Sequence, residues 1–373
     1  MFRRLLSNDL DHGRFVGAIL VATVLLLAAG PFLLPGAKAL NVAAKVLVFV
    51  VLVASFDLLL GYTGIVSFAH TMFFGIGAYG VAVSMTRLGV GWMALLAGIA
   101  GALVLSGLLA LAVGGFSLRV RAMFYSMITL AMAVAFQTLA SQLSGITGGE
   151  DGITFRLPQV LTPSYRWSDE PILGRVIDGR IICYYVLFVA SIACVLLILR
   201  IVNSPFGRVL QAVRENEFRA EAIGYRVVVY RTLSSVLSAL FASLAGVMLA
   251  MWLRYAGPDA ALSFEIMLDI LLIITLGGTG TVYGAVIGTV LFLVAQGYLQ
   301  DALAVVGTQL ASWPLLANLF SPDRWLLWLG LLFVLAVYFI PEGLIGLMRS
   351  KRPTSRSGGG LPGAGPVAGA GVP

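Results

Sequence analysis

The chain has 373 residues, of which 60% are hydrophobic and only 11% are charged. Soluble domains carry about 25% charged residues and need a polar surface, so this composition excludes an ordinary soluble protein. The formal net charge of +7 does not indicate nucleic-acid binding, because the basic residues lie in short loops between apolar runs, where they set the orientation of a membrane protein.

Several apolar runs approach or exceed the roughly 20 residues that a membrane-spanning helix requires. They predict an all-α, polytopic membrane protein with about ten transmembrane helices, some of them broken or re-entrant. The predicted spans cover about residues 15–34, 40–60, 68–86, 91–113, 122–142, 181–200, 231–254, 264–278, 284–303 and 325–341.

The basic residues predict which side of the membrane each connection faces. With both termini in the cytoplasm, all four basic groups become cytoplasmic, as the positive-inside bias requires. The long outer loop 143–180 also carries four arginines, but five carboxylates balance them. The four groups are Arg3, Arg4 and Arg14; Arg119 and Arg121; Arg208, Arg214, Arg219 and Arg226; and Arg349, Lys351 and Arg352.

The predicted organisation is one transmembrane domain, residues 15–347, which includes a cytoplasmic loop at 201–230 and the outer loop at 143–180. A short cytoplasmic segment, residues 1–14, precedes it. The tail at 348–373 is rich in Gly, Pro and Ala, and such a segment cannot bury enough surface to offset its ordering entropy. We therefore expect a disordered cytoplasmic tail.

Three glycine-rich stretches interrupt the apolar pattern: 61–79, 147–152 and 277–284. The third follows a run, Phe264 to Leu276, that makes about 20 Å of helix, less than the roughly 30 Å hydrocarbon core. If this run enters from outside, the break lies within the membrane, where unpaired backbone must be buried or line a wet cavity. The break therefore indicates either a solute path built from helix ends or close packing through small residues.

No cofactor or metal site is expected. The G-x-G in the third stretch lacks a following Lys-Ser/Thr and opens no βαβ unit, so the chain is not expected to bind or hydrolyse ATP itself. Cys183 and Cys194 lie roughly 16 Å apart if helical, too far for a disulfide. His12 and His70 are the only histidines, and no Cys/His cluster supports a metal site.

Charges within apolar segments are rare and costly, and they often carry function. A structural ion pair of Arg254 with Asp269 or Glu265 is the simplest interpretation of three of them. No series of intramembrane acids occurs, which weakens a proton-coupled mechanism. The charged residues are Lys45, Asp57, Arg87, Arg254, Glu265 and Asp269.

The cytoplasmic loop predicts a short amphipathic helix. Ser204 is a suitable N-cap, and Pro205 suits the first helical position. Apolar residues then follow at helical spacing and form one stripe of exposed anchors; they are Phe206, Val209, Leu210 and Val213. Periodicity alone leaves two interpretations open: the helix lies on the membrane surface or inserts into a groove of a partner protein.

Five segments, taken together and in this order, resemble the permease subunits of branched-chain amino acid ABC importers of the LivM type. The resemblance runs from about Gly61 to Leu347. The segments are GYTGIVSFAHTMFFGIGAYG at 61–80, ITGGEDGI at 146–153, SPFGRVLQAVRENEFRAEAIGY at 204–225, TLGGTGTVYGAVIG at 275–288 and YFIPEGLIGL at 338–347. Two features depart from the family's pattern, namely Ala69-His70 and the acidic Glu150-Asp151.

The resemblance implies a division of labour among chains. A periplasmic binding protein delivers the solute, two permease subunits form the path, and two ATPase subunits bind ATP and drive transport. It also implies that the 204–225 loop docks into an ATPase, which favours the partner interpretation. The residues expected at that contact are Pro205, Phe206, Gly207, Arg208, Arg214, Glu215, Asn216 and Glu217.

The glycine breaks supply the candidate residues of the translocation path. Recognition of a zwitterion by backbone groups near 277–284 is a further hypothesis. The path residues are Gly61, Gly64, Ser67, Gly75, Gly77, Thr147, Gly148, Gly149, Gly277, Gly278, Gly280 and Gly284.

The sequence thus predicts a multi-pass permease subunit of the bacterial inner membrane that imports branched-chain or related amino acids. The same machinery importing urea or short-chain amides is an alternative. A stand-alone secondary carrier is an alternative of a different class, and no catalytic constellation favours an enzyme. The lipid bilayer is the remaining partner, and no nucleic acid is expected.

Overall fold

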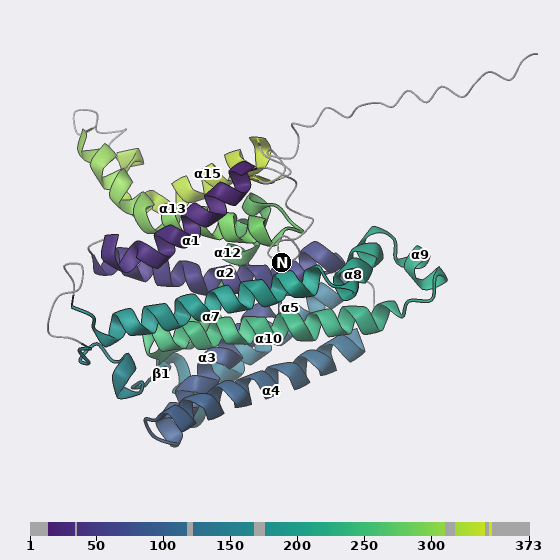
Figure 1. The fold of residues 1–373 in the computed structure, drawn as a ribbon, viewed down its shortest axis with the longest axis horizontal. Helices are drawn as coiled ribbons and strands as arrows, with labels where there is room; N and C mark the ends of the chain where they lie inside the picture. The colour runs from purple at the N-terminus through teal and green to yellow at the C-terminus, as the bar shows by residue number, and fades with distance from the viewer. Residues whose placement is uncertain are drawn as a thin grey trace, which may run out of the picture.

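The computed structural model is a helical bundle (Figure 1) that describes residues 14–33, 36–117, 122–167, 176–309, 318–339 and 343–344. The first half contains α1 (Arg14–Leu33), α2 (Ala37–Thr63), α3 (His70–Arg87), α4 (Trp92–Ser117) and α5 (Ala122–Gln142). Short elements follow: α6 (Ser144–Thr147), η2 (Gly149–Asp151), β1 (Ile153–Thr154) and η3 (Gln159–Leu161).

The second half begins with α7 (Gly179–Val202), α8 (Pro205–Glu215), α9 (Glu217–Ala222) and α10 (Val227–Leu253). It continues with β2 (Tyr255–Ala256), α11 (Pro258–Ala261), α12 (Phe264–Gly277), α13 (Val282–Gln309), η4 (Pro322–Arg324) and α15 (Trp325–Phe339). The predicted tail lies outside the described residues, and so do the basic residues Arg3, Arg4, Arg119, Arg121, Arg349, Lys351 and Arg352.

Each of the ten predicted spans falls on a helix, and eight helical segments in the described ranges are long and apolar enough to cross a membrane. These are Ala37–Thr63, Trp92–Gly115, Phe124–Gln142, Gly179–Val202, Val227–Leu253, Pro258–Gly277, Val282–Gln309 and Pro322–Phe339. The apolar part of α1 is shorter, at Gly17–Leu33, and α3 is not among the eight. The all-helical, multi-pass prediction is confirmed, with β1 and β2 as a two-stranded exception.

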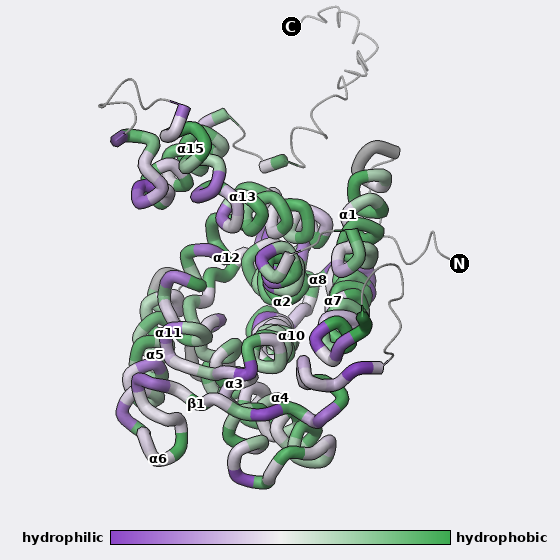
Figure 2. The backbone as a smooth tube through the Cα atoms, turned by 90° about the vertical axis from the view of Figure 1, so that its left-hand side faces the viewer, coloured by the Kyte–Doolittle hydropathy of each residue, from purple (hydrophilic) through white to green (hydrophobic). Residues whose placement is uncertain are grey.

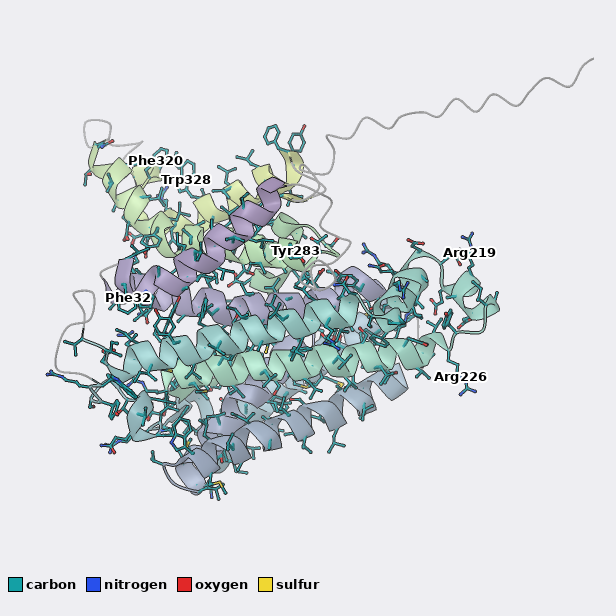
Figure 3. The ribbon with its side chains drawn as sticks, in the orientation of Figure 1. Phe32, Arg219, Arg226, Tyr283, Phe320 and Trp328 are labelled. Atoms are coloured by element: carbon teal, nitrogen blue, oxygen red, sulfur yellow. The ribbon has the colours of Figure 1, made fainter. Side chains whose placement is uncertain are left out.

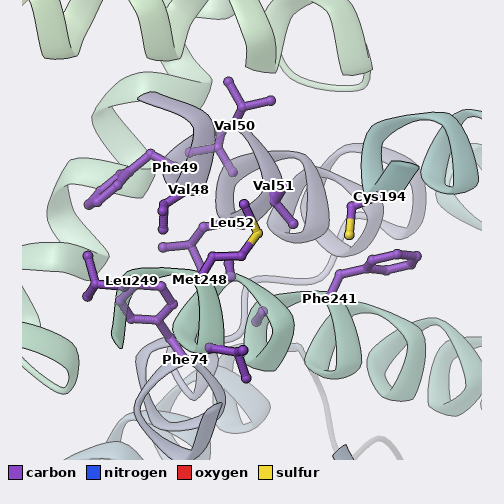
Figure 4. Packing of buried hydrophobic residues seen from close by; sticks show 14 of the residues in the cluster. Val48, Phe49, Val50, Val51, Leu52, Phe74, Cys194, Phe241, Met248 and Leu249 are labelled. Carbon is purple, nitrogen blue, oxygen red and sulfur yellow. The ribbon is translucent and has the colours of Figure 1, made fainter. Parts of the chain in front are cut away.

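Helix α2 is the centre of the bundle, with α7 and α10 on one side and α12 and α13 on the other (Figure 1). Every residue from Val46 to Leu59 is buried. Figure 4 shows Val48 to Leu52 packed against Met248 and Leu249 of α10, Phe74 of α3 and Cys194 of α7. A segment enclosed on all sides has no polar face, which explains why residues 46–59 are apolar around the helix apart from Ser55 and Asp57.

Small residues bring α3 and α10 together. A Cβ added to Gly77 would lie 1.9 Å from the carbonyl oxygen of Ser243, and one added to Gly246 would lie 1.8 Å from that of Phe74. The two backbones are so close that neither position has room for a side chain. Close packing of this kind holds membrane helices together, because no hydrophobic driving force acts between helices in lipid.

Hydrophobic residues predominate along the peripheral helices (Figure 2), and many of them are exposed. On α4, Leu96, Val104, Leu105 and Leu108 are exposed, and α15 exposes Leu326, Leu327 and Val334 in the same way. Exposed aliphatic surface of this extent is typical of a face that contacts lipid rather than water.

Helices α12 and α13 form an antiparallel hairpin. A Cβ on Gly277 would lie 2.1 Å from the carbonyl oxygen of Gly284, and a Cβ on Gly288 would lie 2.6 Å from that of Ile273. Helix α12 has only 14 residues, so the predicted interruption is confirmed.

The two long connections lie at opposite ends of the bundle (Figure 1). The α8–α9 end carries the amphipathic loop. At the other end, β1 pairs antiparallel with β2, with Ile153 opposite Ala256 and Thr154 opposite Tyr255. Glu150 and Asp151 are exposed at this β1–β2 end.

Candidate functional site

Helix α8 begins as its sequence predicts. The Ser204 hydroxyl accepts a hydrogen bond from the Gly207 amide at 3.4 Å, and Pro205 occupies the first turn. This cap satisfies one of the amides that a helix start leaves unpaired. A Cβ on Gly207 would lie 2.0 Å from the Val202 carbonyl oxygen, so the turn between α7 and α8 requires glycine there.

The apolar stripe of α8 does not form exposed anchors, and that part of the prediction is wrong. Leu210 and Val213 are 0% and 1% exposed, and Val209 is half-buried. Phe206 stacks on Tyr230 of α10, with ring centroids 5.7 Å apart. Periodicity identifies an apolar face but not its partner, and here the partner is the chain's own bundle.

The exposed apolar side chains of the loop lie on α9 and just after it. Phe218 is 85% exposed and Ile223 is 71% exposed. Sequence reasoning missed both, although two large apolar residues within the highly charged stretch 214–226 were a usable signal. Arg219 and Arg226 point away from the bundle at the same end (Figure 3).

Helix α9 is fixed against α10. The Asn216 side chain accepts a hydrogen bond from the Arg219 amide at 2.9 Å and caps the helix. Glu217 forms two hydrogen bonds with Arg231 of α10, at 2.7 and 3.0 Å. A bidentate arginine–carboxylate pair restricts orientation as well as distance, so the loop cannot turn freely on the bundle.

The eight residues predicted to contact an ATPase therefore differ in accessibility. Gly207 is buried, and Phe206 and Glu217 are half-buried in contacts within the chain. The remaining five are exposed at the α8–α9 end; they are Pro205, Arg208, Arg214, Glu215 and Asn216.

Arg214 connects α8 to the interior of the bundle. Its guanidinium donates a hydrogen bond to the Gly61 carbonyl oxygen in the last turn of α2. Asp57, one turn earlier, accepts a hydrogen bond from the Gly280 amide at 2.8 Å. Thus α8, the end of α2 and the turn between α12 and α13 form one bonded unit. We call the turn between α12 and α13, residues 278–281, the glycine turn.

Close backbone contacts maintain the glycine turn. Gly278 and Gly280 have backbone φ angles of 104° and 82°, a region that residues other than glycine rarely adopt. A Cβ on Gly61 would lie 2.5 Å from the Gly280 amide, and one on Gly343 would lie 2.5 Å from the Cα of Gly278. The turn is therefore enclosed by α2 on one side and by the segment after α15 on another.

The twelve predicted path residues lie in three places rather than one. Six of them surround the glycine turn or the end of α2; they are Gly61, Gly64, Gly277, Gly278, Gly280 and Gly284. Gly75 and Gly77 lie within α3, and Ser67 is buried just before it. Thr147, Gly148 and Gly149 lie at the β1–β2 end, where a Cβ on Gly148 would lie 2.1 Å from the Gly152 carbonyl oxygen.

The expected partner of Asp269 also differs. Asp269 lines a cavity together with Lys45 of α2 and Gln296 of α13, and neither residue is near it in sequence. Within the described ranges, no group of three or more His, Cys, Asp or Glu residues is arranged to hold a metal ion.

The sequence matches the family model described as branched-chain amino acid transport system / permease component over residues 38–337. It is 25% identical to the high-affinity branched-chain amino acid transport system permease protein LivM of Escherichia coli, covering 89% of this chain and 75% of that protein. It is 21% identical to LivH of the same organism over 80% and 91% of the two chains.

A shorter similarity connects the chain to a sugar importer. It is 32% identical to the ribose import permease protein RbsC of Bacillus subtilis over 31% of this chain and 36% of that protein. The family match covers nearly the whole helical bundle, from the start of α2 to the end of α15. The chain belongs to the family of permease components of branched-chain amino acid transport systems.

Proposed function

We propose that the chain is one of two permease subunits of an ABC importer in the bacterial inner membrane, and that it translocates branched-chain or related amino acids. As a permease component, it is a transport subunit and not an enzyme. Two ATPase subunits bind ATP on the cytoplasmic side, at the α8–α9 end. A periplasmic binding protein delivers the solute to the β1–β2 end, where Glu150 and Asp151 are exposed.

The hydrogen bond from Arg214 to the Gly61 carbonyl oxygen is the observation that supports this mechanism. It joins the proposed ATPase-docking loop to the end of α2 and, through Asp57, to the glycine turn. A displacement of α8 is thereby transmitted to the one point where α12 and α13 reverse direction. Hydrogen-bonded and packed networks of this kind carry coupling between distant sites.

Phe218 and Ile223 are the proposed apolar anchors of the ATPase contact. Both are exposed, whereas the stripe of α8 is used inside the chain. Apolar anchors surrounded by charged residues such as Arg208 and Arg219 are the usual composition of a protein interface.

The glycine turn is the proposed inner part of the translocation path. Helix ends leave N–H and C=O groups without helical partners, and interrupted helices of transporters direct such groups at solutes.

Reconstitution tests the proposed function. The chain is co-purified with a second permease and two ATPases, placed in liposomes, and supplied with a binding protein outside and ATP inside. We expect leucine uptake that requires ATP and the ATPases. Uptake that instead follows an ion gradient and persists without any ATPase would support a stand-alone carrier and contradict the proposal.

Urea or short-chain amides as solutes are the second candidate. Uptake of labelled leucine is measured in competition with excess urea, acetamide and ribose. Leucine uptake that is unaffected by these neutral compounds supports an amino acid importer, and strong inhibition by one of them identifies the alternative solute.

A further inference from the structure

A cavity of about 520 Å³ lies between α2, α10, α12 and α13, toward the β1–β2 end of the bundle. Its volume lies within the roughly 300–1,000 Å³ typical of small-molecule sites. Its walls combine apolar side chains with six charged or amide groups, which is unusual within membrane-spanning segments. Those polar residues are Asn41, Lys45, Asp259, Glu265, Asp269 and Gln296.

The polar centre of the cavity is a cluster of three half-buried residues from three helices. The Lys45 ammonium donates to Gln296 Oε1 at 2.9 Å, and Asp269 of α12 lines the same cavity beside them. A lysine ammonium has three N–H donors, and this hydrogen bond uses one of them. The ammonium also lies 5.3 Å from the centre of the Phe49 ring.

The charged residues of the cavity exclude an anionic solute and favour a solute that carries both a positive and a negative charge. One lysine faces three carboxylates, and of these Asp259 and Glu265 are exposed whereas Asp269 is half-buried. The lining is formally negative, so a lone anion would be repelled. A carboxylate and an ammonium held by one small molecule match Lys45 and Asp269 respectively.

The remaining wall is apolar and suits a hydrocarbon side chain. Phe49, Leu249 and Trp252 are buried around the cavity, and Ile266 is half-buried beside them. Burying methylene groups is favourable, so such a wall discriminates a branched aliphatic side chain from a short polar one.

We propose that this cavity is a solute-binding site of the permease, specific for a zwitterion with an apolar side chain. Lys45 binds the carboxylate, Asp269 binds the ammonium, and the Phe49 and Leu249 wall receives the side chain. The inference rests on the proposed function and assigns its recognition site to a place far from the glycine turn.

A purely structural role for the cluster is the competing explanation, and the chain contains a matched control for it. Lys38 and Asp301 form an ion pair of 2.5 Å between the same two helices, α2 and α13. Both residues of this pair are exposed, and neither lines the cavity. If Lys45 only ties the helices together, replacing Lys38 should have a similar effect.

The experiment measures equilibrium binding to the purified permease–ATPase complex without the binding protein, so that the affinity belongs to the permease. Three compounds are compared: L-leucine, leucinamide, which has only the ammonium, and 4-methylpentanoate, which has only the carboxylate. The variants are Lys45→Gln, Asp269→Asn and the control Lys38→Gln. The melting temperature and ATP hydrolysis of each complex are measured alongside.

We expect Lys45→Gln to weaken leucine about tenfold or more, since hydrogen bonds to charged groups are strong, while leucinamide binding is unchanged. Asp269→Asn should weaken leucine and leucinamide. 4-Methylpentanoate, a lone anion, should bind the wild-type complex far more weakly than leucine and should not lose affinity in Asp269→Asn. Lys38→Gln should change binding of none of the three. The inference is overturned if the wild-type complex does not bind leucine, or if Lys45→Gln acts like Lys38→Gln. Failure of ATP-driven uptake with this binding pattern intact would refute the proposed function alone.

Discussion

The ATPase contact provides the sharpest prediction. Replacing Phe218 with Asp should prevent the ATPase subunits from binding, although Phe218 contributes almost nothing to the fold. The side chain is 85% exposed, so its removal leaves no cavity, and exposed substitutions usually change stability by less than about 0.5 kcal/mol.

The expected loss of binding follows from the exposed area. A buried aromatic residue removes about 150–250 Å² from water, and nearly all of the Phe218 side chain is available for this. At about 25 cal/mol per Å², its burial in an ATPase groove contributes about 3–5 kcal/mol. Interface residues of this kind cost about 2–4 kcal/mol when lost, which corresponds to a dissociation constant weaker by about 30- to 1,000-fold.

The assay is co-purification of the ATPase with tagged permease, followed by a titration of the binding affinity in detergent. Ile223→Asp should show the same loss of ATPase binding as Phe218→Asp. Phe206→Asp is the informative contrast, because Phe206 stacks on Tyr230 inside the chain. It should lower the melting temperature of the permease itself. Full ATPase retention by both Phe218→Asp and Ile223→Asp would falsify the assignment of the contact to α9.

Three further outcomes are expected. Arg214→Gln should reduce the leucine taken up per ATP hydrolysed by about fivefold or more, with hydrolysis preserved. Lys38→Gln, at the opposite end of α2 from Gly61, should leave this ratio unchanged; equal ratios for both variants would contradict transmission through Gly61. Gly77→Leu should cost more than about 3 kcal/mol, seen as a large loss of thermal stability, because the Ser243 backbone cannot move away. Gly101→Ala should be neutral or slightly stabilising, since nothing lies within 4 Å of its added Cβ.

The membrane spans were predictable because the ability of a helix to cross a bilayer depends on its own local sequence. A helix needs a long apolar run to cross the bilayer, and each predicted run falls on a helix. The start of α8 was equally local, since Ser204 and Pro205 act within one turn. The interruption before Val282 was visible in the same way, because the apolar run stops at a glycine-rich stretch, and helix α12 ends at Gly277.

The partners of polar residues were not predictable. Lys45 and Gln296 are 251 positions apart, and the positions around Asp269 in sequence pointed instead to Arg254. The prediction of an apolar stripe on α8 was correct. Whether Leu210 in this stripe contacts lipid, another protein or the chain's own bundle depends on how the helices pack.

The sequence by itself determined the elements: apolar runs long enough to span, the helix start at Ser204, and the glycines at which the runs stop. Each is decided within a few residues by hydrophobicity, capping or backbone freedom. Only the tertiary structure decided that Arg214 reaches Gly61, that the stripe of α8 is buried while Phe218 is exposed, and that Lys45 and Asp269 line one cavity. These contacts join residues from separate helices, and their positions depend on how all the helices pack together.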